Sequence, residues 1–585
     1  MYNVKHPAPL VIECEFVVVN FDPWICGVSS RFHTSSRFVS IERDLSFTTM
    51  ARGLGAEITG SESGMPEGID QAVQFIPQVK SAKSLLIIRK LLIENLASEM
   101  YDGQCAEAVQ GMASARLKFL SADEEALIHD KSLEVLADIG ILVRSDSVLS
   151  LLQDYGARID RRKKIARIPE EVVSSALKKA PKEFKLCARN SANDVDLPAA
   201  GFPRLTTDGL TLYVRDFESG AKRNATRKDL ADAARLADAL EAVDIFWPIV
   251  TVSDVPPAGH NLYELWTGLQ NCELHVQGDC ISADDAKRMI ELASLVAGDD
   301  EELRKRPIFS CATNPISPLS FDKGAVEAQV EFARAGIPIL CHSMSMSGMS
   351  APVTIAGTIV NVNAENLASI VISNCASPRA PHIYGSCSMP ADMKTGEIDH
   401  SAPEGLLLSA ATGQMAKRYQ RPCMVATWGL GEDGPGIRTS FSEAFAIAAS
   451  AFAGSDLVSG IGGLDCAKGY SLDQMVLDSC VWDNFSSFLR DFRIDGDSVA
   501  LEVTRQVGHG NSFLSHPHTA RNFRKELHFW DRSKLAMEAT LSDRMLPEAR
   551  EIARRLLREH EVAPLDKEVV RRGDQVLSEY LRRAR

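Results

Sequence analysis

The sequence of 585 residues has no excess of positive charge, and this lack excludes one large class of proteins. Lys and Arg number 64 against 78 Asp and Glu, which gives a net charge of -14 at pH 7. Nucleic-acid-binding surfaces need clustered positive charge to contact phosphates, so we expect no nucleic-acid partner. A membrane span needs about 18 or more consecutive apolar residues, and we find no such run. The N-terminus also lacks the basic start and the small-residue cleavage site of a signal peptide.

Cysteine pairs and converging metal ligands are missing as well. The 13 cysteines stand singly without any CxxC spacing, which is typical of a protein in a reducing cytoplasm. Cys341 and His342 are adjacent in one expected strand, so their side chains point to opposite faces, and no HxH or HExxH pattern follows a strand. We therefore predict a cytoplasmic protein without a metal site.

Four regions of the chain differ in pattern. The first has no sustained hydrophobic period before one helical stretch. It is an extension of uncertain order, sequence upstream of a true start at Met112, or an extra docking segment. In the second, Ser121 and Glu124 form a capping box and Gly140 ends the helix. The four regions are an N-terminal extension (1–112), a mainly helical lead-in packed on the barrel (113–200), a barrel domain (201–490) and a C-terminal helical tail (491–585).

Short apolar segments alternate with amphipathic segments of helix length in the barrel domain. Apolar strands separated by helices indicate parallel strands buried on both faces. Eight such units predict an α/β fold of the (β/α)8 TIM barrel type, with an open doubly wound sheet as the alternative. No GxGxxG follows the first strand, which disfavours the dinucleotide-binding version of that sheet. The expected strands are Arg204–Thr207, Val243–Val252, Glu273–Gln277, Pro307–Thr313, Ile337–His342, Pro381–Ser386, Cys423–Trp428 and Leu457–Ile461.

The ends of these strands locate the expected site, because TIM barrels carry their chemistry at the C-terminal ends of the strands. Small and polar residues predominate there, and no strand ends in the Lys that a Schiff-base aldolase needs. The residues are Thr207–Gly209, Ser253–Asp254, Gln277–Asp279, Thr313–Asn314, His342–Met344, Ser386, Thr427–Trp428 and Gly462–Gly463.

Three loops that follow strands are rich in Gly, Ser and Met, and they begin at His342, Ser386 and Thr427. As plain structure they are flexible loops with gap-filling methionines. In the alternative, functional interpretation, their small and flexible side chains form a surface on which a large planar cofactor or a partner protein binds. Three such loops on one rim favour the functional interpretation.

From about residue 113 onward the chain resembles the trimethylamine methyltransferase family, whose TIM barrels methylate corrinoid proteins. The resemblance implies transfer of a methyl group from an amine to Co(I) of a separate corrinoid protein that docks over the barrel mouth. It implies no tightly bound cofactor, since the partner supplies cob(I)alamin. We also expect a homo-oligomer. The matching segments are FLSADEEALIHDKSLEVLADIGILV, DLADAARLADAL, SGMSAPVTIAGTIVNVNAENLA, ADMKTG and GHGNSFLSHPHTARNFRKE.

The sequence also departs from the family pattern. Trimethylamine-using members carry pyrrolysine, which is absent here, and the segment after the seventh strand reads ATWGLGEDGPG. The chain is therefore more similar to the pyrrolysine-free members that act on quaternary amines such as glycine betaine. A segment that includes His275 is similar to the DxHxxG loop of corrinoid-carrying domains. Because His275 falls inside an expected strand, we interpret it as a barrel residue. The tail is shortened after Glu526, which puts a role for Trp530 in doubt.

A quaternary amine leaves as a neutral tertiary amine, so its demethylation needs no proton donor. The enzyme must hold the cation, orient one N–CH3 bond and exclude water. Aromatic faces and carboxylates recognise such cations, and Asp254 and Asp279 are further carboxylates at the mouth. The residues with predicted catalytic roles are Trp428, His342 and Asp392. The predicted substrate-binding residues are Trp428, Tyr384, Phe309, Asp208, Glu432 and Lys394. The predicted corrinoid-facing residues are Ser343, Met344, Gly348, Ser386 and Gly429.

Two other functions remain open from the sequence. One is a TIM-barrel lyase, which needs a convergent Lys or a metal set at the strand ends. The other is a non-catalytic homologue that binds amines. For Tyr384 and Phe309, a packed core position is as consistent with the sequence as a role in the site.

Overall fold

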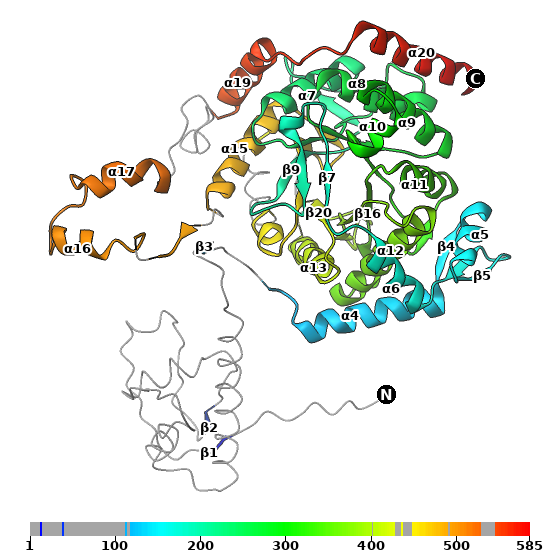
Figure 1. The fold of residues 1–585 in the computed structure, drawn as a ribbon, viewed down its shortest axis with the longest axis horizontal. Coiled ribbons are helices and arrows are strands. Elements are labelled where there is room, and N and C mark those ends of the chain that lie inside the picture. Colours follow the sequence, from blue (N-terminus) through cyan, green and yellow to red (C-terminus); the bar gives the residue numbers. More distant parts are fainter. Residues whose placement is uncertain are drawn as a thin grey trace. The chain divides into compact units, whose positions relative to one another are not determined.

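The computed structural model describes residues 118–400, 402–426, 434–436, 447–488, 492–495, 497–527 and 545–584, together with three two-residue strands nearer the N-terminus. Two compact units divide the chain between Gly111 and Met112 (Figure 1). In the first unit, β1 (Ile12–Glu13) pairs with β2 (Phe38–Val39) in an antiparallel ladder. The second unit, Met112–Arg585, contains the barrel and all the other elements described below.

The lead-in starts with the predicted capped helix. In α4 (Ala122–Glu134) the Ser121 hydroxyl accepts from the Glu124 amide, and the Glu124 carboxylate accepts from the Ser121 amide. The π-helix η1 (Val135–Ile139) continues α4 to Gly140, whose φ of 80° ends it, as predicted. The other lead-in elements are β4 (Ile141–Val143), α5 (Asp146–Asp154), β5 (Arg158–Asp160), β6 (Ile165–Arg167), α6 (Glu170–Lys179), β7 (Phe184–Leu186), η2 (Ser191–Asn193) and β8 (Val195–Leu197).

Eight parallel strands close into a barrel, which confirms the predicted fold class. Every neighbouring pair is parallel, and the last strand pairs with the first (Figure 1). All eight lie within or beside the apolar segments expected from the sequence. In spatial order they are β9 (Arg204–Thr207), β12 (Ile245–Phe246), β13 (His275–Asp279), β14 (Phe309–Ala312), β16 (Ile339–Ser343), β18 (His382–Ser386), β20 (Cys423–Ala426) and β21 (Leu457–Ile461).

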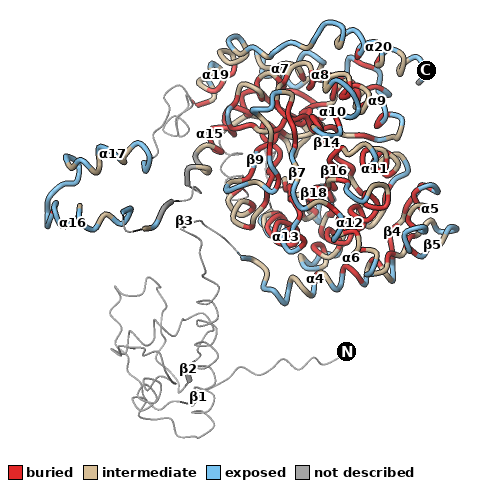
Figure 2. The backbone as a smooth tube through the Cα atoms, viewed as in Figure 1, coloured by how far each residue is buried: buried red, intermediate tan, exposed pale blue. Residues whose placement is uncertain are grey.

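Helices surround the barrel, and their apolar residues pack against the outward faces of the strands (Figure 2). The long helix α12 (Ile355–Ala376) is apolar enough to cross a membrane by length and composition. Its most apolar window is 78% buried inside the protein, as expected of a core helix. The helices between or after barrel strands are α7 (Arg227–Ala239), η3 (Pro257–Gly259), α8 (His260–Asn271), α9 (Ala283–Ala297), α10 (Asp300–Lys305), α11 (Lys323–Ala335), α12, α13 (Glu404–Arg418) and α15 (Leu472–Phe488).

The N-terminal end of the barrel is closed by the β7–β8 hairpin. Leu186, Val195 and Leu197 of this hairpin share one apolar cluster with the inward-facing Ile245 and Leu340 of the barrel strands. The Cys187 amide also donates to the Pro307 carbonyl, just before β14 begins. Packed side chains therefore fill this end, and only the opposite end is available for a site.

Short strands connect the loops at the C-terminal end of the barrel, and the tail follows the last barrel helix. The connecting strands are β10 (Tyr213–Arg215), β11 (Lys222–Arg223), β17 (Met346–Ser347), β19 (Met389–Pro390), β22 (Gly463–Leu464) and β23 (Gly469–Tyr470), whereas β15 (Ser320–Phe321) pairs with β4 of the lead-in. The tail comprises β24 (Phe492–Arg493), which pairs with β3 (Met112–Ala113), and helices α16 (Leu501–Val507), α17 (Pro517–Glu526), α19 (Met545–Glu559) and α20 (Lys567–Ala584).

Candidate active site

A group of polar atoms is buried at the C-terminal ends of the barrel strands without hydrogen-bond partners among the described residues. Buried polar groups are nearly always paired, so such a group marks a place where something else binds. Two of these side chains, Gln277 of β13 and His342 of β16, are 0% and 6% exposed, and β14 lies between their strands. The unpaired atoms are Asp208 Oδ2, Gln277 Nε2 and Oε1, Thr313 Oγ1, Asn314 Oδ1 and His342 Nε2.

Trp247 lies at the centre of this group. Its indole Nε1 donates to Asp279 Oδ2 at 2.5 Å, and its ring centroid is 5.6 Å from that of His342. Gly209 lies directly against the indole, since a Cβ at this position would be 2.5 Å from Cε2 of Trp247. The Thr207 hydroxyl fixes the backbone of Trp247 by accepting from its amide at 2.8 Å. We refer to Asp208, Trp247, Gln277, Asp279 and His342 as the mouth cluster.

The carboxyl groups around Trp247 hold their protons more tightly than ordinary carboxyl groups. Burial raises the pKa of Asp208 to about 8 and that of Asp279 to about 7. Glu264 of α8 is also buried, and burial together with the nearby Asp279 raises its pKa to about 8. Strongly shifted carboxyl groups at the mouth of a barrel are a frequent sign of a functional site.

His342 is kept neutral at the same place. Burial alone lowers the pKa of its imidazole to about 4. Gln277 and Asp279 are two residues apart in β13, so both side chains point to the same side of the strand. The cluster thus combines an indole, a neutral imidazole, an amide and two carboxyl groups.

The predicted rim loops after β16 and β18 are brought together. Strands β17 and β19 pair in parallel, and the Ser345 amide donates to the Ser388 hydroxyl at 2.9 Å. Gly348 lies against Met393, since a Cβ there would be 3.0 Å from the Met393 sulfur. Met344 is exposed on the same rim.

Two of the predicted corrinoid-facing side chains form hydrogen bonds with buried side chains of the protein. The Ser343 hydroxyl donates to the buried carboxylate of Glu365 in α12 at 2.6 Å. The Ser386 hydroxyl donates to that of Ser388 at 2.9 Å. Both side chains are buried, so they stabilise the loops and do not present a surface to a cofactor.

Tyr384 and Phe309 lie on the outer face of the barrel wall, away from the mouth cluster. The Tyr384 hydroxyl donates to Asn363 of α12 at 2.8 Å, and the ring of Phe309 packs against Phe332 of α11. Strand alternation explains both positions, because their neighbours Ile383 and Ser310 point inward. Their contacts are those of core residues, and we leave both out of the proposed site.

Asp392 and Lys394 belong to an exposed turn of the loop after β18. The Asp392 carboxylate accepts from the Lys394 amide at 2.7 Å, and this contact lowers its pKa. Lys394 is exposed to solvent. Asp392 therefore has a local role in the turn, and neither residue joins the mouth cluster. The remaining predicted residues, Trp428, Gly429 and Glu432, lie outside the described residues.

Trp247 and Glu264 were not among the site residues predicted from the sequence. The apolar segment Val243–Val252 predicts one long strand, whereas β12 ends at Phe246 and Trp247 is the first residue after it. Pro248 is the signal that could have divided this segment, because proline donates no hydrogen bond to a sheet ladder. Glu264 is inside a helix, where nothing in the sequence distinguishes a buried carboxyl group from an exposed one.

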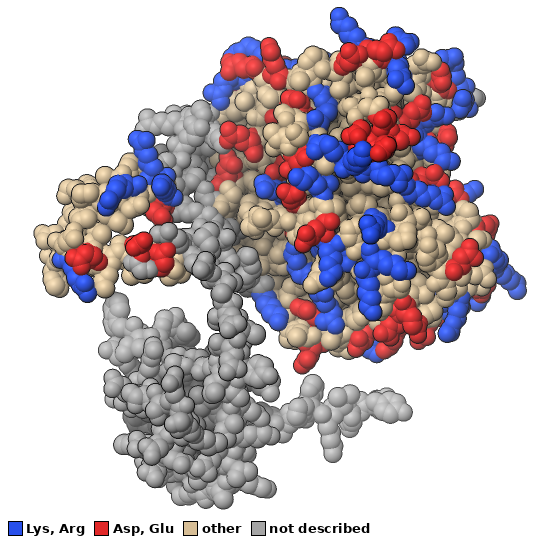
Figure 3. Space-filling model, in the orientation of Figure 1, with Lys and Arg blue, Asp and Glu red and all other residues tan. Residues whose placement is uncertain are grey.

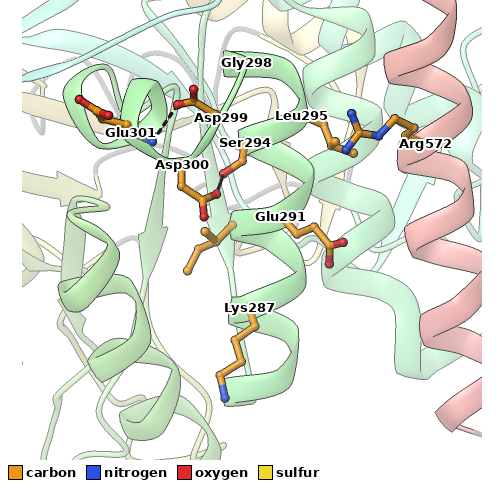
Figure 4. Close-up of a pocket in the computed structure, with 10 residues that line it drawn as sticks. Lys287, Glu291, Ser294, Leu295, Gly298, Asp299, Asp300, Glu301 and Arg572 are labelled. Carbon is orange, nitrogen blue, oxygen red and sulfur yellow. Dashed lines mark hydrogen bonds between the residues drawn. The ribbon is translucent and has the colours of Figure 1, made fainter.

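A pocket of about 540 Å³ occurs on the outside of the barrel, between the end of α9, the start of α10 and α20 (Figure 4). Its lining mixes Lys287 and Arg572 with Glu291 and Asp300, and Asp300 already accepts from the Ser294 hydroxyl at 2.6 Å. None of its lining residues has a buried polar atom without a hydrogen-bond partner, which distinguishes this pocket from the mouth cluster.

The described residues contain no group of three or more His, Cys, Asp or Glu that could hold a metal ion. The ten cysteines in the described part of the chain are all free. On the face shown in Figure 3, basic and acidic side chains are interspersed, and neither sign covers the barrel continuously.

Comparison with known proteins identifies a family of methyltransferases. The trimethylamine methyltransferase MttB of Desulfitobacterium hafniense (strain DSM 10664 / DCB-2) is 31% identical over 411 residues, or 69% of this chain and 82% of that protein. MttB of Methanosarcina barkeri is 29% identical over 460 residues, 77% of this chain and 93% of that protein. A glycine betaine methyltransferase of D. hafniense (strain Y51) is 26% identical over 438 residues, 74% of this chain and 88% of that protein.

Among solved structures, the M. barkeri monomethylamine methyltransferase MtmB is 13% identical with a TM-score of 0.41, over 75% of this chain and 93% of that chain. The family model described as Trimethylamine methyltransferase (MTTB) matches residues 96–585. The relatives are methyltransferases, which supports a transferase activity here. The chain belongs to the trimethylamine methyltransferase family.

Proposed function

We propose that this protein transfers a methyl group from a quaternary amine or a methylamine to the Co(I) of a separate corrinoid protein. The observation that carries the proposal is the mouth cluster: buried, unpaired polar groups around Trp247 at the open end of a barrel of this family. We include in the proposal that the chain binds no cofactor tightly and works in the cytoplasm, as its free cysteines favour.

The composition of the cluster suits a methylated ammonium group. The face of an indole and nearby carboxyl groups attract such a cation, and the attraction is stronger where water is excluded. A neutral His342 adds no positive charge that would oppose the cation. The residues of this chain would therefore hold the nitrogen and orient one N–CH3 bond towards the open end.

The reaction needs positioning more than proton transfer when the substrate is quaternary. The C–N bond of one methyl group breaks, the electron pair stays on the nitrogen, and the amine leaves neutral. The methyl group joins the reduced corrinoid of the partner, which supplies the nucleophile. Trp247 and Asp279 would contribute by fixing the substrate in line with that nucleophile and keeping water out.

The rim of the mouth supports docking of a partner. Seven large apolar side chains from loops after five different barrel strands are between 45% and 73% exposed. Exposed apolar side chains gathered at one site are typical of protein–protein interfaces. These residues, the apolar rim, are Leu212, Ile281, Ile316, Met344, Met349, Val353 and Met393.

The direct test is methylation of cob(I)alamin, free or bound to a corrinoid protein. The purified chain is incubated with a panel of quaternary and methylated amines, and methylcobalamin formation is followed by absorbance. We expect methylcobalamin with at least one quaternary amine and none without enzyme. Binding of an amine without methyl transfer would instead support the non-catalytic homologue. No amine binding at all would reopen the lyase hypothesis.

A further inference from the structure

The charge balance of the mouth cluster bears on the kind of amine it accepts. None of the charged groups that act on Asp208, Asp279, Glu264 or His342 is a Lys or Arg of the described residues. Among the described residues, the charged groups that act on them are further carboxyl groups. These are Asp478 of α15, which acts on Asp208, and Asp279, which acts on Glu264.

We propose, building on the proposed function, that the mouth cluster binds a permanently charged alkylammonium cation that carries no carboxylate. The indole of Trp247 has Asp279 at its Nε1 edge and Gly209 packed against its ring, and Asp208 directly precedes Gly209 in the chain. Together they provide anionic and aromatic contacts for one positive nitrogen. The carboxylate of a betaine would enter a buried site that already holds acidic groups. No described basic side chain is available there to compensate for it.

Burying a second negative charge without a partner is costly in a site of low polarity. His342 Nε2 and Gln277 Nε2 are the unpaired nitrogens of the cluster that could face a betaine carboxylate. Both groups are neutral, so each would contribute one hydrogen bond and no charge. A simple tetraalkylammonium or an alcohol such as choline avoids this cost altogether.

Cation binding in this cluster should release a proton. The groups that face the site are Asp208, Asp279 of β13, Glu264 of α8, His342 of β16, Asp478 of α15 and Cys387 after β18. With pKa values of about 7 to 8, Asp208, Asp279 and Glu264 are partly protonated near neutral pH. A bound cation stabilises the ionised form of its neighbours, so affinity for the cation should rise with pH between 6 and 8.5.

The test compares ligands with the same trimethylammonium head. Choline, tetramethylammonium and glycine betaine are titrated into the full-length protein by calorimetry, in phosphate and in Tris, so that the enthalpy difference counts released protons. We expect choline and tetramethylammonium to bind about 10-fold or more tightly than glycine betaine, as an uncompensated buried charge implies. We also expect proton release with the two cations, and a rise in their affinity from pH 6 to 8.5.

Variants test whether Asp208 and Asp279 are responsible for cation binding and for the proton release. Asp208→Asn and Asp279→Asn should weaken choline binding and abolish part of the proton release. Glu291→Gln, in the outer pocket of Figure 4, serves as the matched control and should change neither. Arg438 lies outside the described residues, and Arg438→Ala is included to test it as a carboxylate partner.

The outcomes separate the two proposals. Tighter binding of glycine betaine than of choline, above all if Arg438→Ala removes it, overturns the inference and leaves the methyltransferase proposal standing. Tight choline binding without methylation of supplied cob(I)alamin supports the inference and contradicts the proposed function. Absence of binding by every cation overturns the inference. If the Asn variants do not fold, the pH dependence of the unchanged protein decides the question alone.

Discussion

Two histidines point into the barrel, one near each end, and their hydrogen bonds differ completely. His275, at the start of β13, is bonded at both nitrogens, with Nδ1 2.8 Å from the Cys187 carbonyl and Nε2 3.0 Å from the Ser310 hydroxyl. His342, near the end of β16, has no hydrogen-bond partner for Nε2 among the described residues. Burial lowers the pKa of both to about 4.

This difference separates a structural end of the barrel from a functional one. At the N-terminal end a hairpin fills the interior and satisfies the polar groups it covers. At the C-terminal end, equally buried polar groups have no hydrogen-bond partner in the part of the chain that the structure describes. Single unpaired atoms also occur near the starts of strands, at His382 Nδ1 and Ser455 Oγ, but at the C-terminal end several belong to one cluster. Since each unpaired buried group costs free energy of folding, their accumulation there indicates that a ligand completes that end.

The largest effect is expected from Trp247, because it contacts both Asp279 and the proposed cation. Trp247→Ala should lower kcat/KM for the amine about 100-fold, whereas Trp247→Phe keeps an aromatic face and should lose about 10-fold. Steady-state methylcobalamin formation measures both. Trp428→Ala, tested in parallel, should raise the KM substantially if that indole also contacts the substrate. Unchanged kinetics in Trp247→Ala would remove Trp247 from the site.

Replacing each histidine by alanine tests the comparison directly. His275→Ala leaves the Ser310 hydroxyl and the Cys187 carbonyl unpaired beside a cavity, so we expect a loss of about 2–4 kcal/mol in the free energy of unfolding. His342→Ala breaks no hydrogen bond at Nε2, so its stability loss should be smaller while amine turnover falls. Urea unfolding and activity per folded molecule are measured for both. The opposite pattern would contradict the assignment of the two ends.

Charges on the apolar rim should weaken partner docking without affecting the amine. The double variant Met344→Asp/Met349→Asp should raise the KM for the corrinoid protein about 10-fold, because desolvating an unpaired charge opposes association. Amine binding by calorimetry should stay the same. Leu407→Asp on α13 is the control, since Leu407 is exposed but is not in a rim loop. Equal effects of both variants would argue against a docking role for the rim.

The smallest effect is a change in the pH dependence of stability. The raised pKa of Asp208, about 8 in the folded protein, means that the folded state keeps a proton which the unfolded state has lost above about pH 4. Stability contributed by this group is therefore present at low pH and is lost as pH rises towards 8. Asp208→Asn has no proton to lose at this position. The difference in Tm between this variant and the unchanged protein should therefore increase by a few degrees, in favour of the variant, between pH 5.5 and pH 8.5.

Asp456 near the N-terminal end provides the matched control for this measurement. Its carboxylate accepts from Lys417 Nζ at 2.7 Å and from the Cys423 and Ala199 amides. Asp456→Asn should therefore lower the Tm at both pH values. A Tm advantage of Asp208→Asn over the unchanged protein that shrinks as pH rises would contradict the shifted pKa.

Much of the fold could be predicted because it depends on local patterns. Ser121 and Gly140 bound the first helix through cap geometry that three or four residues determine. Alternating apolar strands and amphipathic helices specify a parallel barrel with few competing topologies. The position of the mouth followed from that fold, which is why Asp208 and His342 were among the predicted site residues.

The rest depended on which face of an element a side chain takes. Tyr384 and Phe309 were candidates because they are aromatic residues of barrel strands, yet a shift of one residue turns a side chain from the barrel interior to the helix layer. Trp247 was missed because a long apolar segment hid the early end of β12.

The sequence by itself therefore determined the eight-stranded barrel, its capped lead-in and the family, because these follow from hydrophobic period, caps and the order of matching segments. Only the tertiary structure decided that Trp247, Asp208, Asp279 and His342 surround one point. They come from separate strands and loops, and no pattern along the chain records a contact made across a closed barrel. Burial, which shifts the pKa values of Asp208, Asp279 and His342, arises only once those strands have closed.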